Sequence, residues 1–364
     1  MRIVGAKLYP LDYPFVGGGY ATSYGARTHL NNVLVALEAE DGTVGYGEIS
    51  RVTGVSPRPT DPDQVAGAER AVRALLDVPL AAPRDGASLL SGGDNRNLTC
   101  GLETALLDLQ AKTAGVPLSV LFGGMRRDSV PCYYSIGQAA PDEVTARLTE
   151  AAGEGYRILQ VKIGGDPATD TARVAAALDA APADAIVLPD ANGGLSPSDA
   201  AALIARFDDP RMYWEEPCKT YEENRLLGER TGARLLLDQC MAGLDRYLDV
   251  CREGFAAAVG LKATILGSPV RARIARDLCV EHGIRLKVDD SWGADIGTAL
   301  ALHLALGVPD PLLLSGVDMR LYFDGRCDPA GPSFAAAELQ AGQGLGLGIS
   351  PDPEALGPPI VEIR

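Results

Sequence analysis

The sequence predicts an α/β protein in which a (β/α)8-type barrel follows a smaller α+β capping domain. Eight short apolar runs after residue 128, Ala-rich amphipathic segments between them and a regular spacing of the runs predict this fold. Such runs are typical of parallel strands that helices cover on both faces. The chain of 364 residues is long enough for a barrel of about 250 residues and one further domain.

Residues 1–128 are expected to form the capping domain. From residue 30 two strand-like runs flank Asp41-Gly42, a pair that is typical of a hairpin turn. Apolar residues at helical spacing follow in residues 66–80 and 100–112, and a run of helices closes near residues 122–124. The Gly-rich segment 16–27 is either a plain surface loop or a mobile lid.

Residues 129–320 are expected to form the barrel. The eight candidate strands read VPCYYSI, ILQVKI, AIVLPDA, MYWEE, ARLLLD, AAVGLK, IRLKVDD and PLLLSGV. Six of them have a polar residue at the C-terminal end, namely Lys162, Asp190, Glu215, Asp238, Lys262 and Asp289. Successive members of this set are 28, 25, 23, 24 and 27 residues apart, which is the period of a βα unit. The Pro- and Gly-rich residues 321–364 are expected to return to the capping domain.

Charge and composition exclude several classes of function. The formal net charge of −15 would repel nucleic acids and anionic membrane surfaces, so neither is expected as a partner. No apolar stretch approaches the ~20 residues that a bilayer requires, and the first residues do not read as a signal peptide. Seven scattered cysteines without a CxxC pair favour reduced thiols and a cytoplasmic location.

Carboxylates end three consecutive candidate strands: Asp190, Glu215 and Asp238. In a barrel the C-terminal ends of the strands converge on one mouth, where three anions would repel one another unless a cation lies among them. Oxygen ligands without His or Cys favour Mg²⁺. Alternatively, each carboxylate caps a helix or forms a salt bridge, but independent caps need not recur at the same register. Glu216 should point to the other side of its strand.

Lysine is rare in this chain, which contains six, so a lysine within an apolar run needs an explanation. Lys162 and Lys262 end the strands on either side of the acidic trio and would face each other across the mouth. Beside a divalent cation and partly desolvated, each should have a depressed pKa and act as a general base. The alternative is a surface lysine whose stem covers apolar neighbours.

The motifs VKIGG, DANGG, WEEPC, LDQC and LKATILGS, in this order, resemble the enolase superfamily and its muconate-lactonizing-enzyme-like subgroup along essentially the whole chain. The resemblance implies an enolase-like, modified TIM barrel with one Mg²⁺ per active site, held by Asp190, Glu215 and Asp238. It also implies Lys162 and Lys262 as the acid/base pair, with Asn192 beside the metal. The segment 16–27 becomes the lid of the capping domain, and its Tyr20 is a candidate substrate-binding residue.

Two departures from the subgroup affect the tuning of the base. The subgroup commonly has Lys-x-Lys on the second strand, whereas this chain has Gln160 two residues before Lys162. The carboxylate of the fifth strand is usually followed by Glu, and here the neighbour is Gln239. Neither departure removes a primary catalytic position, but both affect how the pKa of Lys162 is set.

Within the subgroup, VDDSWGADIGTALALHLA, SGVDM and GLGLGISPDPEALGPPI look most like the cis-3-hydroxy-L-proline dehydratase and hydroxyproline betaine 2-epimerase group. The indole of Trp292 would attract a substrate ammonium by a cation–π interaction, and Asp290, Asp295 or Asp318 would pair with the same cation. The alternatives are a packing role for Trp292 and helix caps for the aspartates.

The sequence therefore predicts an Mg²⁺-dependent lyase or epimerase acting on a proline-like amino acid, with dehydration preferred. Lysine would remove the α-proton, the metal would stabilise the enediolate, and a 3-hydroxyl would leave. Without a leaving group, reprotonation on the other face would give 2-epimerisation. A dipeptide epimerase or N-acylamino acid racemase is the next alternative, and a non-catalytic ligand-binding homologue is a more remote one. A homo-oligomer is expected.

Overall fold

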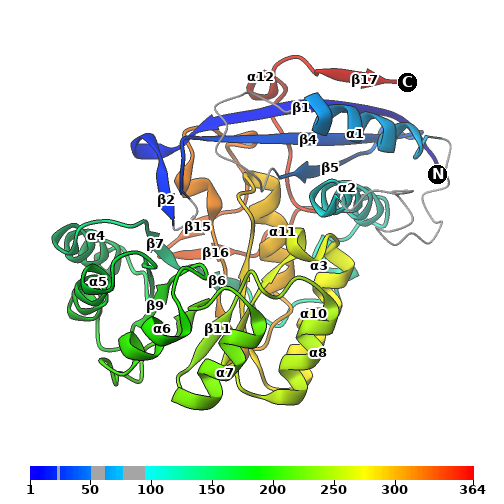
Figure 1. Cartoon of the computed structure of the whole chain (residues 1–364). Coiled ribbons are helices and arrows are strands. Elements are labelled where there is room, and N and C mark those ends of the chain that lie inside the picture. The colour runs from blue at the N-terminus through cyan, green and yellow to red at the C-terminus, as the bar shows by residue number, and fades with distance from the viewer. Residues whose placement is uncertain (23–24, 51–61, 77–94) are drawn as a thin grey trace.

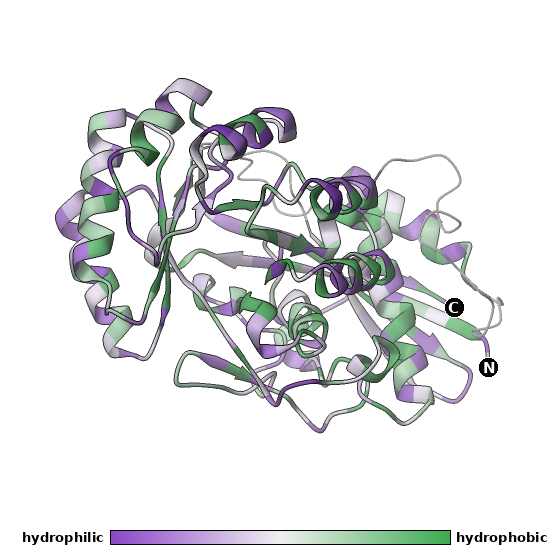
Figure 2. Ribbon diagram, turned by 90° about the horizontal axis from the view of Figure 1, so that it is seen from below, coloured by the Kyte–Doolittle hydropathy of each residue, from purple (hydrophilic) through white to green (hydrophobic). Residues whose placement is uncertain are grey.

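The computed structural model describes residues 1–22, 25–50, 62–76 and 95–364. An antiparallel sheet with its helices lies against one end of a parallel barrel that helices surround (Figure 1). The outer helices carry both hydrophilic and hydrophobic residues along their length (Figure 2), as expected for elements with one face toward a core. No helix of the described residues is both long enough and apolar enough to cross a membrane.

Eight parallel strands form the barrel, and each of them lies within a run that the sequence predicts. They are β7 (Tyr134–Ile136), β8 (Ile158–Lys162), β9 (Ile186–Asp190), β10 (Trp214–Glu215), β11 (Leu235–Leu237), β12 (Ala258–Lys262), β13 (Arg285–Asp289) and β14 (Leu313–Ser315). Neighbours in sequence are neighbours in the sheet. A parallel bridge between Cys132 and Gly316 joins the last strand to the first. Both the predicted fold class and the closed order of strands are thus confirmed.

Helices connect successive strands and cover the outside of the barrel (Figure 1). They are α4 (Pro141–Gly153), α5 (Pro167–Ala180), α6 (Pro197–Ile204), α7 (Tyr221–Thr231), α8 (Leu244–Glu253), α9 (Ala263–Leu266), α10 (Pro269–Glu281) and α11 (Asp295–Ala305). Proline at the first turn and a capping side chain begin several of them, as at Asp166, Ser196 and Ser268. Where they occur, these local signals end the βα loop close to the mouth of the barrel.

The capping domain is a four-stranded antiparallel sheet packed on helices. Its strands β1 (Ile3–Pro14), β4 (His29–Ala39), β5 (Val44–Ile49) and β17 (Val361–Ile363) lie in the order β17-β1-β4-β5. The helices are α1 (Pro62–Arg73), α2 (Arg96–Thr113) and α3 (Leu118–Leu121). A Cβ at Gly47 would lie 1.9 Å from the carbonyl oxygen of Gly101, so glycine is needed where β5 meets α2.

The elements of the capping domain differ from the sequence-based expectation mainly in their bounds. The hairpin is confirmed, because β4 pairs antiparallel with β5 around Gly42, whose φ is 84°. The helix predicted at 100–112 lies within α2, and that predicted at 66–80 begins earlier and ends at Arg73, with residues 77–80 outside the described part. Within segment 16–27, which is expected from the sequence to be a loop or a lid, β2 (Tyr20–Thr22) pairs with β3 (Gly25–Arg27), and these two strands form a short hairpin.

The C-terminal segment places its last strand in the sheet of the capping domain. Strand β17 pairs antiparallel with β1, and the two termini lie at the same side of the molecule (Figure 1). On the way, β15 (Phe334–Ala335) and β16 (Glu338–Gln340) form a small sheet with β6 (Ser129–Pro131), and α12 (Pro353–Leu356) follows. The segment therefore ties both parts of the chain together.

One buried histidine links α11 to α3 and predicts a pH effect on stability. Nδ1 of His303 accepts a hydrogen bond from the backbone N–H of Ser119 at 3.2 Å, and burial lowers the pKa of His303 from 6.5 to about 4. Between these values the unfolded chain binds a proton that the folded chain does not, so stability falls as the pH falls. We expect a loss of about 3 kcal/mol across this window.

Urea unfolding of the wild type and the His303→Gln variant at pH 7 and pH 4.5 measures this contribution. Glutamine keeps one donor and one acceptor but does not titrate, so the variant should lose less stability than the wild type on acidification. Equal losses in the two proteins would show that His303 does not carry the effect.

Candidate active site

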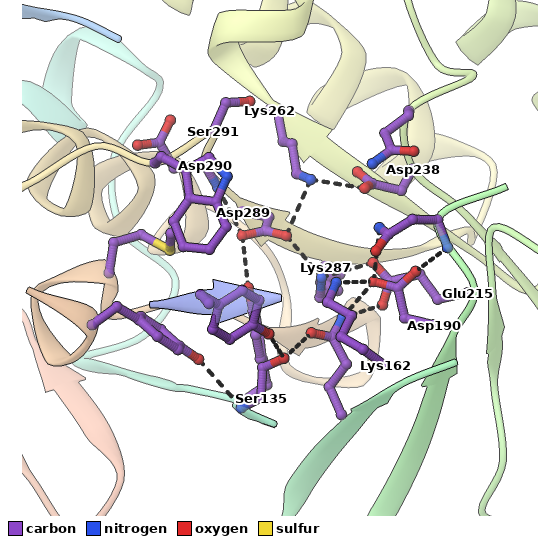
Figure 3. Close-up of a pocket in the computed structure, with 18 of the residues that line it drawn as sticks. Ser135, Lys162, Asp190, Glu215, Asp238, Lys262, Lys287, Asp289, Asp290 and Ser291 are labelled. Atoms are coloured by element: carbon purple, nitrogen blue, oxygen red, sulfur yellow. Dashed lines mark hydrogen bonds and ion pairs between the residues drawn. The ribbon is translucent and has the colours of Figure 1, made fainter. Parts of the chain in front are cut away.

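A pocket of about 550 Å³ lies at the C-terminal ends of the barrel strands, a size within the usual range of small-molecule sites. Its lining includes the last residues of five strands: Lys162, Asp190, Glu215, Lys262 and Asp289. Asp238 follows β11 directly and also lines it. The structure therefore brings the predicted acidic trio and both lysines together at one mouth (Figure 3).

The two lysines lie on opposite walls of the barrel. Lys162 ends β8 and Lys262 ends β12, four positions apart in a closed ring of eight strands. Nζ of Lys162 donates to Asp190, and Nζ of Lys262 donates to Asp238 at 2.8 Å. Figure 3 shows both amines directed toward the carboxylates between them. Neither amine points into bulk solvent, so the surface-lysine alternative does not hold.

The pKa values of the lysines differ from the sequence-based expectation. Burial alone would lower the pKa of Lys162, but Asp190 raises it above its ordinary value. For Lys262, burial again acts to lower the pKa and is outweighed by Asp238 and Asp289. The expected depression depended on a divalent cation beside each amine, and the carboxylates by themselves act in the opposite direction.

The carboxylates and an amide provide oxygen atoms suited to a hard cation. Among the described residues, Glu215, Asp238 and Asp289 form a group whose ligand atoms all lie within 4.8 Å of one another. Asp190 is not in this group, although it pairs in register with Glu215 across β9 and β10. Oδ1 of Asp238 and Oδ1 of Asn192 are buried without a hydrogen-bond partner in the described part of the chain. Unpartnered buried oxygens of this kind fit Mg²⁺.

The room for Asp238 depends on a glycine in the neighbouring strand. A Cβ at Gly260 in β12 would lie 2.8 Å from Oδ1 of Asp238 and 3.3 Å from its Cα. We therefore expect Gly260→Ala to displace this carboxylate and to weaken Mn²⁺ binding by about 10-fold or more, as measured by calorimetry.

A matched glycine controls for the added methyl group. A Cβ at Gly153, which ends α4, would meet nothing within 4 Å, so Gly153→Ala should leave Mn²⁺ affinity unchanged. If Gly260→Ala binds Mn²⁺ as tightly as the wild type does, the close approach does not govern the position of Asp238.

Several polar residues of the pocket were not predicted as site residues. Nζ of Lys287 donates to Glu215 at 2.8 Å and to Asp289 at 2.7 Å. Nε2 of Gln160 donates to Glu215 at 2.7 Å and to Asp190 at 3.2 Å. The two-residue period of a strand was the available signal, since it puts Gln160 on the side of Lys162 and Lys287 on the side of Asp289.

A chain of hydrogen bonds connects Gln160 to the hairpin of segment 16–27. Oγ of Ser135 donates to Oε1 of Gln160 and shares a hydrogen bond of 2.6 Å with the Tyr20 hydroxyl. Tyr20, Gly25 and Arg27 of this hairpin line the pocket. Strands β2 and β3 therefore form part of the pocket wall, and Gln160, the departure from the subgroup, has a structural role there.

Trp292 lies in the pocket lining within a cluster of aromatic rings. Its ring centroid is 5.1 Å from that of Phe15 and 5.2 Å from that of Tyr20, in edge-to-face orientations. The guanidinium of Arg27 lies 5.9 Å from the Trp292 centroid, so a cation of the protein itself lies near this ring. Asp290 also lines the pocket, and burial raises its pKa to about 6.

The capping domain fixes the loop that carries Trp292. The residue has a φ of 64°, which is unusual for a side chain of this size. Nδ2 of Asn32 donates to the Trp292 carbonyl at 2.7 Å. The carboxylate of Glu48 accepts from the backbone N–H groups of Ala294 and Gly297 at the start of α11. Two residues of the capping domain therefore hold the seventh-strand loop in place.

Three acidic residues near the mouth have other partners. Asp295 accepts from Nε of Arg326 at 2.6 Å, and Asp318 accepts from Nε of Arg320 at 2.7 Å. Neither lies in the pocket lining, so we assign them to structural ion pairs and not to the substrate. Glu216 lies outside the lining as expected and accepts from the backbone N–H of Cys240 at 3.0 Å.

Comparison with known proteins finds matches along most of the chain. Residues 143–355 match a family described as enolase C-terminal domain-like, and residues 16–123 match the mandelate racemase / muconate lactonizing enzyme N-terminal domain. A cis-3-hydroxy-L-proline dehydratase of Roseibium aggregatum is 29% identical over 99% of both chains. A hydrophobic dipeptide epimerase of Citrifermentans bemidjiense is 28% identical over 82% of this chain and 83% of the relative.

Solved structures show the same fold. A member of the enolase superfamily from Roseovarius nubinhibens, complexed with magnesium, superposes with a TM-score of 0.89 at 26% identity. The match covers 100% of this chain and 99% of that chain. Both domains and their arrangement are therefore shared with this structure.

Proposed function

This chain belongs to the enolase superfamily, and from that membership we propose that it removes the α-proton of a proline-like amino acid, with dehydration of cis-3-hydroxy-L-proline as its reaction. The relative from Roseibium aggregatum carries this name and aligns over 99% of both chains. The observation that carries the proposal is the placement of Lys162 and Lys262 on opposite walls of one pocket.

The stereochemistry of the substrate matches this placement. In cis-3-hydroxyproline the hydroxyl and the carboxylate share one face of the ring, so the α-proton lies on the opposite face from the hydroxyl. One lysine amine can take the α-proton from one face while the other lysine ammonium protonates the departing hydroxyl from the other. One water leaves, and a carbon–carbon double bond forms between C2 and C3.

The acidic residues would hold the metal ion. Asp190, Glu215 and Asp238 supply carboxylate oxygens, and Asn192 adds an amide oxygen without a partner among the described residues. Mg²⁺, when bound, would supply positive charge that stabilises the substrate carboxylate as the α-proton leaves. Gln160 keeps Asp190 and Glu215 in place by donating to both.

The remaining lining residues suit an amino-acid-like substrate. Asp290 belongs to the pocket lining on the loop of Trp292, and its Oδ2 lies close to Gly293 and Gly297; its carboxylate would pair with the ring ammonium of the substrate after a turn of the side chain toward the pocket. The aromatic rings of Trp292 and Tyr20 offer apolar faces to the carbon ring. The hairpin that carries Tyr20 can exclude water from the reacting atoms.

Incubation in D₂O with Mg²⁺, followed by NMR, tests the proposal. The compounds are cis-3-hydroxy-L-proline, trans-3-hydroxy-L-proline, L-proline and a proline betaine. We expect loss of the amino-acid spin system with the cis compound and little elimination with the trans compound, whose leaving groups share one face. Absence of both elimination and α-exchange with every compound would contradict the proposal, even if one of them binds.

Epimerisation is the second candidate, because lysines on both faces also permit removal of a proton on one side and its return on the other. The hydrophobic dipeptide epimerase among the relatives supports this candidate. Deuterium at Cα without loss of the spin system would favour it over dehydration. Dipeptides and N-acylamino acids added to the same experiment would separate the substrate classes.

We also place the proposed reaction in the cytoplasm. All seven cysteines are free thiols, and five of them are buried. Unpaired thiols in this number are usual in a reducing compartment.

A further inference from the structure

A third lysine lies inside the barrel mouth, and the proposed reaction does not use it. Lys287 is on β13, two residues before Asp289, and only 1% of its surface is exposed. Nζ of Lys287 contacts Oε1 of Glu215 at 2.8 Å and Oδ2 of Asp289 at 2.7 Å. It also lies 4.3 Å from the centre of the Tyr133 ring. Figure 3 shows Lys287 between the two carboxylates.

The ammonium of Lys287 is surrounded by groups of the kind that bind a cation. Two carboxylate oxygens and the face of an aromatic ring enclose it, and all three attract positive charge. Glu215 and Asp289 are also two of the three residues whose ligand atoms lie within 4.8 Å of one another. Lys287 is therefore already bonded to most of the group that could otherwise hold a metal ion.

The positive charge of Lys287 affects the balance of charge in the pocket. Asp190, Glu215, Asp238 and Asp289 are buried carboxylates, and Lys162, Lys262 and Lys287 are the lysines that bind them. With all three lysines protonated, these seven groups leave one negative charge. Without Lys287, the excess would be two negative charges, and the position between Glu215 and Asp289 that its ammonium occupies would be open to a further cation.

We propose that Lys287 is a resident cation that holds Glu215 and Asp289 in place and restricts this acidic centre to a single divalent ion. It is a positioning residue, because it acts through Glu215 and Asp289 and takes no part in the proposed proton transfers. This inference rests on the proposed function, in which the centre binds one metal ion.

Mn²⁺ binding to the full-length chain tests it without any substrate. The protein is freed of metal with a chelator, and bound Mn²⁺ is counted by electron paramagnetic resonance and by metal analysis after dialysis. We expect one Mn²⁺ per chain in the wild type and two in Lys287→Met, a doubling of the stoichiometry. The double variant Lys287→Met/Asp289→Asn, which lacks one of the released carboxylates, should return to one.

Lys112 provides a matched control in the capping domain. Its Nζ pairs with Asp108 at 2.7 Å and lies 4.6 Å from the centre of the Tyr46 ring, so it has the same kinds of partner away from the pocket. Lys112→Met should bind one Mn²⁺ with unchanged affinity. An extra ion in this variant as well would overturn the inference, because loss of any buried lysine would then suffice.

The outcomes separate this inference from the proposed function. One Mn²⁺ in both the wild type and Lys287→Met overturns the role of Lys287 and leaves the proposed function standing. A wild type that binds no Mn²⁺ overturns both. If Lys287→Met does not fold, Lys287→Gln takes its place, because glutamine keeps a hydrogen-bond donor without the charge. We expect two Mn²⁺ per chain in this variant as well, and one would overturn the role of Lys287.

Discussion

Replacement of Lys162 or Lys262 by alanine is expected to lower turnover of the substrate by about 10²–10⁴-fold, the usual contribution of a general acid or base. Each amine lies on its own wall of the pocket, so neither can take over the work of the other. Turnover by the two variants and the wild type is measured by NMR with saturating Mg²⁺.

Isotope exchange in D₂O should distinguish the two variants from each other. The variant that lacks the base should lose both α-exchange and elimination. The variant that lacks the acid should keep exchange at Cα while elimination is lost, because the hydroxyl then leaves without a proton. This split would identify which lysine faces the α-proton.

Two controls make the result specific. Mn²⁺ binding should change by less than about 10-fold in both variants, because neither lysine is a ligand. Lys112→Ala removes a partly buried ion pair in the capping domain and should keep full turnover. Wild-type turnover in either active-site variant would exclude that lysine as an essential acid or base.

The barrel could be predicted because its strands are short, apolar and regularly spaced. The same spacing fixed which residues end the strands, and in a closed barrel those ends must meet. The predicted carboxylates and lysines therefore line one pocket, although their spacing carries no information about distances. The hairpin at segment 16–27 was missed because its strands, Tyr20–Thr22 and Gly25–Arg27, are too short for an alternating pattern.

Lys287 shows why part of the site was not predicted. A charge within a buried strand is normally costly, so the sequence pattern favours site residues at the strand ends. The structure offsets the cost with Glu215 and Asp289, which come from positions 72 residues before it and 2 residues after it. A pattern local to one strand cannot reveal the more distant partner.

Asp295 and Asp318 lie outside the pocket lining for a related reason. Asp295 and Asp318 follow barrel strands, so they resemble residues of the mouth. Their partners Arg326 and Arg320 lie in or next to the C-terminal segment. The path of that segment brings Arg326 to Asp295, whereas the partner of Asp318 lies only two residues further along the chain.

Asp190→Asn and Asp238→Asn are each expected to weaken Mn²⁺ binding by more than about 100-fold, since loss of a ligand should exceed the 10–100-fold effect of an outer partner. Oδ1 of Asp238 has no partner among the described residues, so this oxygen is free to bind an ion. Calorimetric titration with Mn²⁺ measures the affinity, and thermal unfolding verifies that each variant is folded.

Asp289→Asn is the matched comparison, because Asp289 belongs to the same acidic group by distance. Its oxygens already accept from Tyr133 at 3.0 Å and from Lys287 at 2.7 Å, and Lys287 and Lys262 lower its pKa in spite of burial. Asp289 is thus the partner of the lysines, and its substitution should weaken Mn²⁺ binding by less than about 10-fold. Should Asp289→Asn abolish binding while Asp190→Asn retains it, the ion would instead be held by Glu215, Asp238 and Asp289, and the ligand set inferred from the sequence would be wrong.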